Sequence, residues 1–211
     1  MKPQPCDITH HGKERFFHCR TRRKIYAYVG IVVLAMIIMI GFFAAKARGD
    51  QFQNPAEGRF QAEELVGSQW LNTPGGQPIR LADRRGKVTI VHFWTFGCIN
   101  CKRNLPIYNR WSKSYAGKQV EVIGVHTPET STEASIANVR AALPKLGITY
   151  PVLIDGEGVN WRVWHQSIWP TIYLIDKHGN VRYRWEGELE YNDQDGTRKM
   201  TDLIIALLNE K

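Results

Sequence analysis

The chain has 211 residues, a length typical of one globular domain of about 150 residues with shorter segments attached. Its formal net charge at pH 7 is +8, but this excess is concentrated near the N-terminus. Residues 1–24 contain seven Lys and Arg against two acidic residues, whereas residues 51–211 contain nineteen against seventeen. No groove-binding motif and no basic face with interleaved aromatics occurs, so the composition argues against nucleic-acid binding.

Residues 1–24 form a polar, basic tail, which we expect to be flexible and reduced on the cytoplasmic side of a membrane. The tail contains two cysteines and three histidines: Cys6, Cys19, His10, His11 and His18. Their spacing matches no standard zinc signature, so we predict no metal site there.

Residues 25–45 contain no charged side chain and would span about 31 Å as a helix, which matches the hydrocarbon core of a bilayer. Basic residues crowd the N-terminal flank, so the tail should stay inside and the remaining chain outside. The alternative is a cleaved signal peptide, because Ala45-Lys46-Ala47 is an A-x-A pattern, but the apolar stretch is long for one. We predict a single-pass anchor in the cytoplasmic membrane, with the C-terminal domain in the periplasm or extracytoplasmic space.

Residues 46–62 are polar and read as a linker, and residues 63–211 as an α/β domain. Trp70 and Leu71 lead into a turn at residues 74–76. Apolar runs and helical spacing then predict strands at residues 79–81, 88–94, 120–125, 150–154, 171–175 and 181–185, and helices from residue 98, at 135–146 and at 200–208.

Two cysteines, Cys98 and Cys101, follow the apolar strand at residues 88–94 and open a helix. Unpaired N–H groups and the helix dipole favour the Cys98 thiolate there, so its pKa should fall below that of a free thiol. Lys102 and Arg103 add positive charge nearby. One turn later, Cys101 faces the same way as Cys98, close enough for a disulfide. Pro106 follows at a position where a helix normally kinks.

The pattern Phe93-Trp94-x-x-x-Cys98-x-x-Cys101, with a later Trp169-Pro170-Thr171, resembles the thioredoxin superfamily. Residues 76–94 are more narrowly similar to membrane-anchored TlpA/ResA-type redoxins, and the Cys-Ile-Asn-Cys motif to the thioredoxin-like domain of DipZ-type proteins. This resemblance implies a thioredoxin-like fold, a central mixed β-sheet flanked by helices. It also implies that the Trp169–Pro170 bond is cis and that Trp169, Pro170 and Thr171 bind the substrate backbone. For Trp161, Trp164 and Trp169 we favour core and rim packing over a partner groove.

Three positions depart from the family pattern. His92 replaces a buried Asp of thioredoxins that shuttles protons to the second cysteine, and a histidine could do so near neutral pH or simply pack in the core. Asn104 stands where many TlpA/ResA-like proteins carry a catalytic Glu. Gly97 replaces the tryptophan before the first cysteine, which should leave Cys98 less shielded.

The sequence therefore predicts a membrane-anchored thiol:disulfide oxidoreductase, with Cys98 as the nucleophile and Cys101 as the resolving cysteine. The resemblance favours a disulfide reductase, with cytochrome c maturation as a role and a DsbD/CcdA-type membrane protein as the electron donor. Protein thiols and disulfides are the expected substrates, and no cofactor or metal is expected.

Three alternatives stay open. A thiol peroxidase would use a Pro-x-x-x-Thr-x-x-Cys loop, of which Thr95 and Cys98 are present while Val91 replaces the proline. A copper-delivery module would use the two cysteines with a histidine such as His126 or His165. An adaptor without catalysis would keep the bridge as a structural disulfide.

Overall fold

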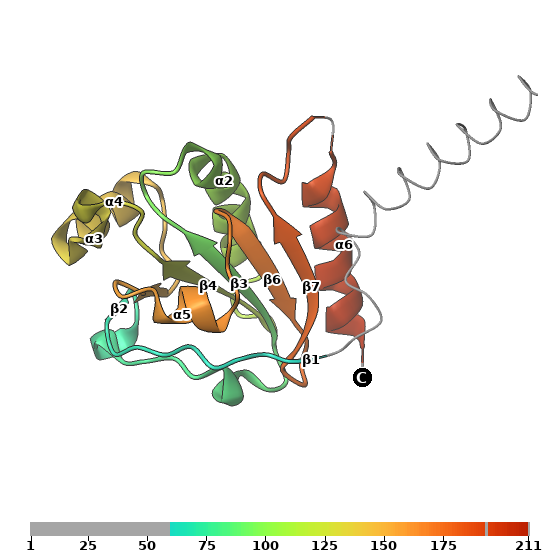
Figure 1. Cartoon of the computed structure of the whole chain (residues 1–211). Coiled ribbons are helices and arrows are strands. Elements are labelled where there is room, and N and C mark those ends of the chain that lie inside the picture. The colour runs from blue at the N-terminus through green and yellow to red at the C-terminus, as the bar shows by residue number, and fades with distance from the viewer. Residues whose placement is uncertain (1–59, 193, 211) are drawn as a thin grey trace, which may run out of the picture. The chain divides into compact units, whose positions relative to one another are not determined.

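The computed structural model describes residues 60–192 and 194–210 (Figure 1). The predicted tail at residues 1–24, the predicted membrane span at 25–45 and most of the predicted linker lie outside the described residues. Within the described ranges, no helix combines the length and the apolar character needed to cross a membrane.

Among the described residues, seven strands form one mixed sheet in the order β1-β7-β6-β3-β4-β5-β2 (Figure 1). Strand β3 runs parallel to β4 and β4 parallel to β5, and the remaining neighbours are antiparallel. The strands are β1 (Phe60–Gln61), β2 (Trp70–Leu71), β3 (Val88–Trp94), β4 (Val120–His126), β5 (Val152–Ile154), β6 (Thr171–Ile175) and β7 (Asn180–Glu186).

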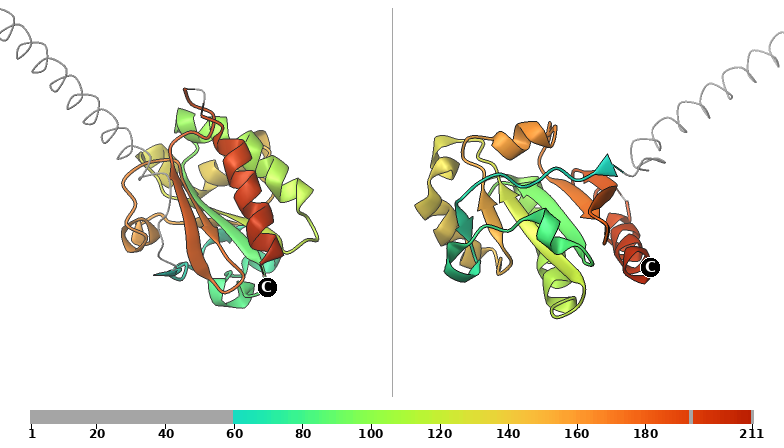
Figure 2. Two further views of the ribbon diagram at one scale, coloured as in Figure 1. Left: turned by 90° about the vertical axis from the view of Figure 1, so that its right-hand side faces the viewer. Right: turned by 90° about the horizontal axis from the view of Figure 1, so that it is seen from below.

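Helices cover both faces of the sheet (Figure 2). Helices α2, α4 and α6 pack on one face, and α5 with residues 62–81 packs on the other. The helices are α2 (Ile99–Ser114), α3 (Ser131–Ala134), α4 (Ile136–Lys145), α5 (Val159–Val163) and α6 (Gly196–Asn209), with 3-10 turns η1 (Pro74–Gly76) and η2 (Leu81–Arg84). Because β3 is covered on both sides, all seven of its residues are buried, which explains its continuous apolar run.

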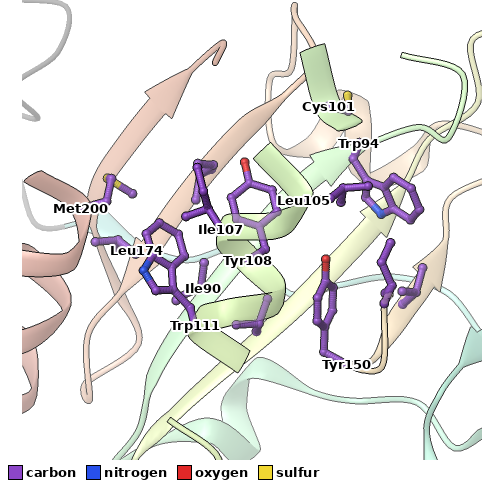
Figure 3. Close-up of a cluster of buried hydrophobic side chains, with 14 of the residues drawn as sticks. Ile90, Trp94, Cys101, Leu105, Ile107, Tyr108, Trp111, Tyr150, Leu174 and Met200 are labelled. Carbon is purple, nitrogen blue, oxygen red and sulfur yellow. The ribbon is translucent and has the colours of Figure 1, made fainter. Parts of the chain in front are cut away.

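Helix α2 is anchored by its apolar face (Figure 3). That face contributes Leu105, Tyr108 and Trp111, which pack with fully buried side chains of the sheet and of α6: Ile90, Leu174 and Met200. Burying each large apolar side chain contributes roughly 1.5–3 kcal/mol to folding. The first turn of α2, which carries the two cysteines, is therefore held on a rigid support.

Most predicted elements are present, and three differ from the prediction. Residues 79–81 form no strand, because the Glu64 carboxylate accepts the N–H groups of Leu81 and Ala82, and the chain turns into η2. Helix α6 begins at Gly196, where the Asp195 side chain caps it by accepting the N–H of Arg198. Residues 60–62 of the predicted linker belong to the domain, since β1 pairs with β7.

Candidate active site

Cys98 is the N-cap residue of α2 and is half-buried at the end of the loop that follows β3. Its sulfur accepts a hydrogen bond from the N–H of Cys101 at 3.3 Å. Cys101 lies one turn into the helix and is completely buried, and both cysteines are free thiols in the structure. Arg103, which the sequence places near Cys98, pairs with Glu188 at 2.8 Å.

The two thiols differ strongly in acidity. The pKa of Cys98 is lowered to about 6, first by its hydrogen bond with the Cys101 side chain and further by the N–H groups at the start of α2. Burial, together with the same side-chain contact, raises the pKa of Cys101 far above that of a free thiol. At neutral pH, Cys98 is therefore the reactive thiolate and Cys101 is a protonated thiol.

This difference predicts how the two thiols respond to alkylation. In a protein with Cys6→Ser and Cys19→Ser, which keeps Cys101, the rate of Cys98 modification by iodoacetamide should titrate with a midpoint near pH 6. Because only the thiolate reacts, the rate at pH 5 should be about tenfold below the plateau. Cys101 should stay unmodified, as mass spectrometry of the native protein will show. A midpoint at about pH 8.5, the value of a free cysteine, would contradict this assignment.

The segment predicted to bind substrate lies at the same end of the sheet as the cysteines. Thr171 pairs with Phe93 in the sheet, so the residues before Thr171 lie next to the loop that leaves β3. The Trp169–Pro170 bond is cis, in agreement with the geometry that the resemblance implied. Thr171 is buried, and its hydroxyl donates to the Ile168 carbonyl at 2.8 Å. Its side chain therefore stabilises the turn before β6. That its backbone binds a substrate stays a prediction.

The tryptophans near this segment divide between core and rim. Trp164 is buried against Phe93 and Tyr173, as core packing predicts. Trp161 and Trp169 are partly buried, and their rings are in contact with centroids 4.0 Å apart and planes tilted by 30°. Ile99 and Ile168, from the two segments, are 60% and 43% exposed, so apolar side chains are available at the surface on both sides of the site.

His92 lies in β3 and is completely buried between aromatic rings. Its ring centroid is 4.4 Å from that of Tyr108 and 5.5 Å from that of Tyr150. Within the described ranges, neither ring nitrogen has a hydrogen-bond partner. Burial lowers the pKa of His92 to about 3, so the imidazole is neutral at pH 7 and does not titrate near neutrality. Its role as a proton shuttle stays a prediction.

Asn104, at the position where the resemblance to TlpA/ResA-like proteins implied a catalytic Glu, has a defined structural role. Its side-chain amide donates to the Tyr108 hydroxyl at 2.9 Å and to the Gly187 carbonyl at 3.0 Å. Its oxygen accepts the N–H of Leu189 at 2.9 Å. Asn104 therefore ties the helix of the two cysteines to the loop after β7.

One functional candidate escaped the sequence analysis. Glu133 is 3% exposed, and its carboxylate accepts the N–H of Gly97, the residue before Cys98, at 2.7 Å. Its only signal in the sequence is the pattern Thr130-x-x-Glu133, which is typical of a helix start and says nothing about Gly97. The carboxylate occupies the space beside Gly97, so the expectation that a glycine there leaves Cys98 less shielded is incomplete.

Known proteins share this fold and sequence pattern. A model of the AhpC/TSA family matches residues 60–184. The chain belongs to the AhpC/TSA family. Among similar proteins, Protein DipZ of Mycobacterium tuberculosis is 40% identical over 171 residues, which are 78% of this chain and 24% of DipZ. The chain thus spans about a quarter of the length of DipZ. Thiol-disulfide oxidoreductase ResA of Geobacillus thermodenitrificans is 30% identical over 118 residues, or 56% of this chain and 65% of ResA.

Solved structures confirm the predicted fold of this AhpC/TSA family member. A crystal structure of a thiol:disulfide interchange protein DsbE from Chlorobium tepidum superposes with a TM-score of 0.61 and 22% identity, over 72% of this chain and 99% of that one. A thioredoxin-like superfamily protein gives a TM-score of 0.63 at 25% identity, over 72% and 97%. The described domain therefore has a thioredoxin-like α/β fold with a mixed sheet.

Proposed function

We propose that this chain is a thiol:disulfide oxidoreductase. The observation that carries the proposal is the contrast between a half-buried Cys98, stabilised as a thiolate at the start of α2, and a buried, protonated Cys101 one turn later. This arrangement separates the attacking thiol from the resolving thiol within one helix. Relatives named as thiol-disulfide oxidoreductases support the same reaction class.

In the reducing direction, the Cys98 thiolate attacks one sulfur of a partner disulfide. A bond between Cys98 and the partner forms, the partner's own S–S bond breaks, and one partner thiolate leaves. Cys101 then loses its proton and attacks the Cys98 sulfur, which releases the second partner thiolate and leaves a Cys98–Cys101 disulfide. Two electrons pass from this chain to the partner, and the reverse sequence oxidises a partner dithiol.

The second step needs a path for the Cys101 proton, because the thiol is completely buried. We assign this task to His92, as the sequence suggested. Within the described ranges neither ring nitrogen of His92 has a hydrogen-bond partner, so this role requires Cys101 or a water molecule to come within reach of one of them during the step.

We further propose that the domain works outside the cytoplasm, attached to the membrane through residues 25–45, and acts as a reductase. The uncharged stretch at 25–45 and the resemblance of residues 76–94 to membrane-anchored TlpA/ResA-type redoxins support this setting. A DsbD/CcdA-type membrane protein is the proposed electron donor, and apocytochrome c is the leading client. Trp169, Pro170 and Thr171 would receive the substrate backbone beside Cys98.

The reduction potential of the Cys98–Cys101 pair tests the direction of electron flow. It should be measured on the full chain with Cys6→Ser and Cys19→Ser, equilibrated against glutathione or dithiothreitol. A value near or below about −250 mV is expected for a reductase. A value of about −150 mV or above would mean that the protein installs disulfides, and the proposed direction would be wrong.

Thiol peroxidase activity is the second candidate, because Thr95 precedes Cys98 at the spacing of peroxidase loops. The Thr95 side chain is buried, and its hydroxyl lies 3.3 Å from Nε2 of His126. Peroxide consumption and insulin reduction, measured side by side on the same preparation, separate the two activities.

For the copper-delivery alternative, the described ranges contain no group of three or more His, Cys, Asp and Glu side chains placed to hold a metal ion.

A further inference from the structure

The three residues before the nucleophilic cysteine are all held by side chains from the end of β4 and from the segment that follows it. The Thr95 hydroxyl lies 3.3 Å from Nε2 of His126, and the Phe96 N–H donates to the same nitrogen at 3.4 Å. The Gly97 N–H donates to Oε1 of Glu133 at 2.7 Å. The loop that carries the reactive thiol is therefore positioned from outside its own helix.

Glu133 is firmly anchored on the side away from this loop. Its second oxygen, Oε2, accepts the N–H groups of Glu129 and Thr130, both at 2.9 Å, and the Thr130 hydroxyl at 3.1 Å. Thr130 and Glu133 form a capping box at the start of α3. The carboxylate is thus fixed between two backbone segments.

The hydrogen bonds of Glu133 also determine its charge. Burial alone would raise the pKa of Glu133, but hydrogen bonds from the Thr95 hydroxyl and from the surrounding N–H groups outweigh burial and lower it. The carboxylate stays ionised at neutral pH, and its lone pairs are occupied by donors. Glu133 is therefore suited to hold the loop and unsuited to accept a proton from a cysteine.

The Glu133 carboxylate leaves no room for a side chain at position 97. The backbone of Gly97 is outside the left-handed region, so its conformation is open to residues with a side chain. A Cβ atom at this position would nevertheless lie 2.1 Å from Oε1 of Glu133. The glycine is required by the carboxylate and not by the backbone.

We propose that Glu133 is a positioning residue for Cys98: by holding the Gly97 N–H, it keeps the Cys98 sulfur facing the N–H of Cys101. This inference rests on the proposed function, and it assigns control of the redox equilibrium to a side chain 35 positions away from the nucleophile in the sequence. Without Glu133, the loop loosens, the sulfur loses part of its N–H contact, and the thiolate of the reduced protein becomes less stable.

Loss of the carboxylate also removes a negative charge, which by itself would stabilise the thiolate. Glu129 provides the matched control for this effect. Its exposed carboxylate raises the pKa of Cys98, yet it contributes to the Glu133 anchor only through its backbone N–H. Glu129→Gln therefore removes charge near Cys98 and leaves the hold on Gly97 in place.

The test compares the equilibrium constant for reduction of the Cys98–Cys101 disulfide by glutathione among variants of the full chain with Cys6→Ser and Cys19→Ser. Glu133→Ala should lower this constant by about tenfold, the scale of one charge-assisted hydrogen bond, which corresponds to a potential about 30 mV more negative. Glu129→Gln should leave the constant unchanged or raise it. Gly97→Ala should lower it when residue 133 is Glu, and should have no further effect in the Glu133→Ala background.

Two results would overturn the inference. One is a Glu133→Ala protein that unfolds cooperatively and has the parental equilibrium constant, and the other is a shift in the same direction as Glu129→Gln. If Glu133→Ala fails to fold, Gly97→Ala alone still decides, since an unchanged constant in that variant excludes the proposed contact. If the parent protein neither equilibrates with glutathione nor reduces insulin, the proposed function fails, and that result is distinct from a failure limited to the Glu133 variants.

Discussion

Cys98→Ser should lower the rate of insulin reduction to background. Cys101→Ser should leave the attack by the Cys98 thiolate intact and trap the partner as a mixed disulfide. The serine hydroxyl forms no thiolate, so the first variant lacks a nucleophile. The second variant keeps the reactive thiol but has no resolving group. Turbidity of reduced insulin reports turnover, and non-reducing electrophoresis reports the mixed disulfide.

The matched control for this pair is Cys6→Ser with Cys19→Ser, which should keep full activity because the proposed reaction uses only the thiols of Cys98 and Cys101. Normal turnover in Cys98→Ser would contradict the proposed mechanism.

The same assay tests the proposed role of His92 in proton transfer. In His92→Phe, the mixed disulfide should accumulate transiently, because only the Cys101 step is slowed, and an unchanged time course would remove His92 from the mechanism.

Asn104→Ala should destabilise the domain by about 3 kcal/mol, although residue 104 is not one of the reacting groups. The substitution leaves the buried N–H of Leu189 and the partly buried carbonyl of Gly187 without their partner. A buried polar group that loses its partner costs about 1–3 kcal/mol. The free energy of unfolding in urea measures this loss.

Asn138→Ala serves as the matched control, because Asn138 is exposed on α4 and makes one side-chain hydrogen bond, to the Thr132 carbonyl. Its effect should stay within about 0.5 kcal/mol. If Asn104→Ala unfolds at the same urea concentration as Asn138→Ala, Asn104 does not hold the loop after β7. Asn104→Asp gives a further comparison, since it keeps the acceptor for Leu189 and loses the donor for Gly187.

Local patterns predicted the parts of the site that are close together in the sequence. The apolar run of β3, the start of a helix at Cys98 and the strand beginning at Thr171 all follow from periodicity and from residue types with strong local preferences. The cis bond at Trp169–Pro170 came from resemblance, because sequence spacing alone gives no such geometry.

Contacts between distant residues escaped prediction. Gly97 and Glu133 are 36 positions apart, and Asn104 and Leu189 are 85 apart. Nothing in the local pattern indicates that these groups meet, since their partners are backbone N–H groups that every residue except proline offers. The missing strand at residues 79–81 has the same origin, because a carboxylate 17 positions away takes the N–H of Leu81. Apolar periodicity could therefore be read from the sequence, whereas polar contacts between residues far apart in the chain could not.

Helix α2 is fastened along its length as well as at its start. Beyond Asn104, the Asn109 amide donates to the Leu146 carbonyl at 2.9 Å, and the Trp111 indole donates to the Thr201 hydroxyl at 3.1 Å. These bonds should keep the helix in place when the two sulfurs join or separate, so we expect the change to be limited to the side chain of Cys98 and its immediate neighbours. The surfaces of the oxidised and the reduced domain should consequently differ only around the two cysteines. A partner that distinguishes the two redox states must therefore contact the sulfur atoms themselves, because the rest of the domain surface should be the same in both states.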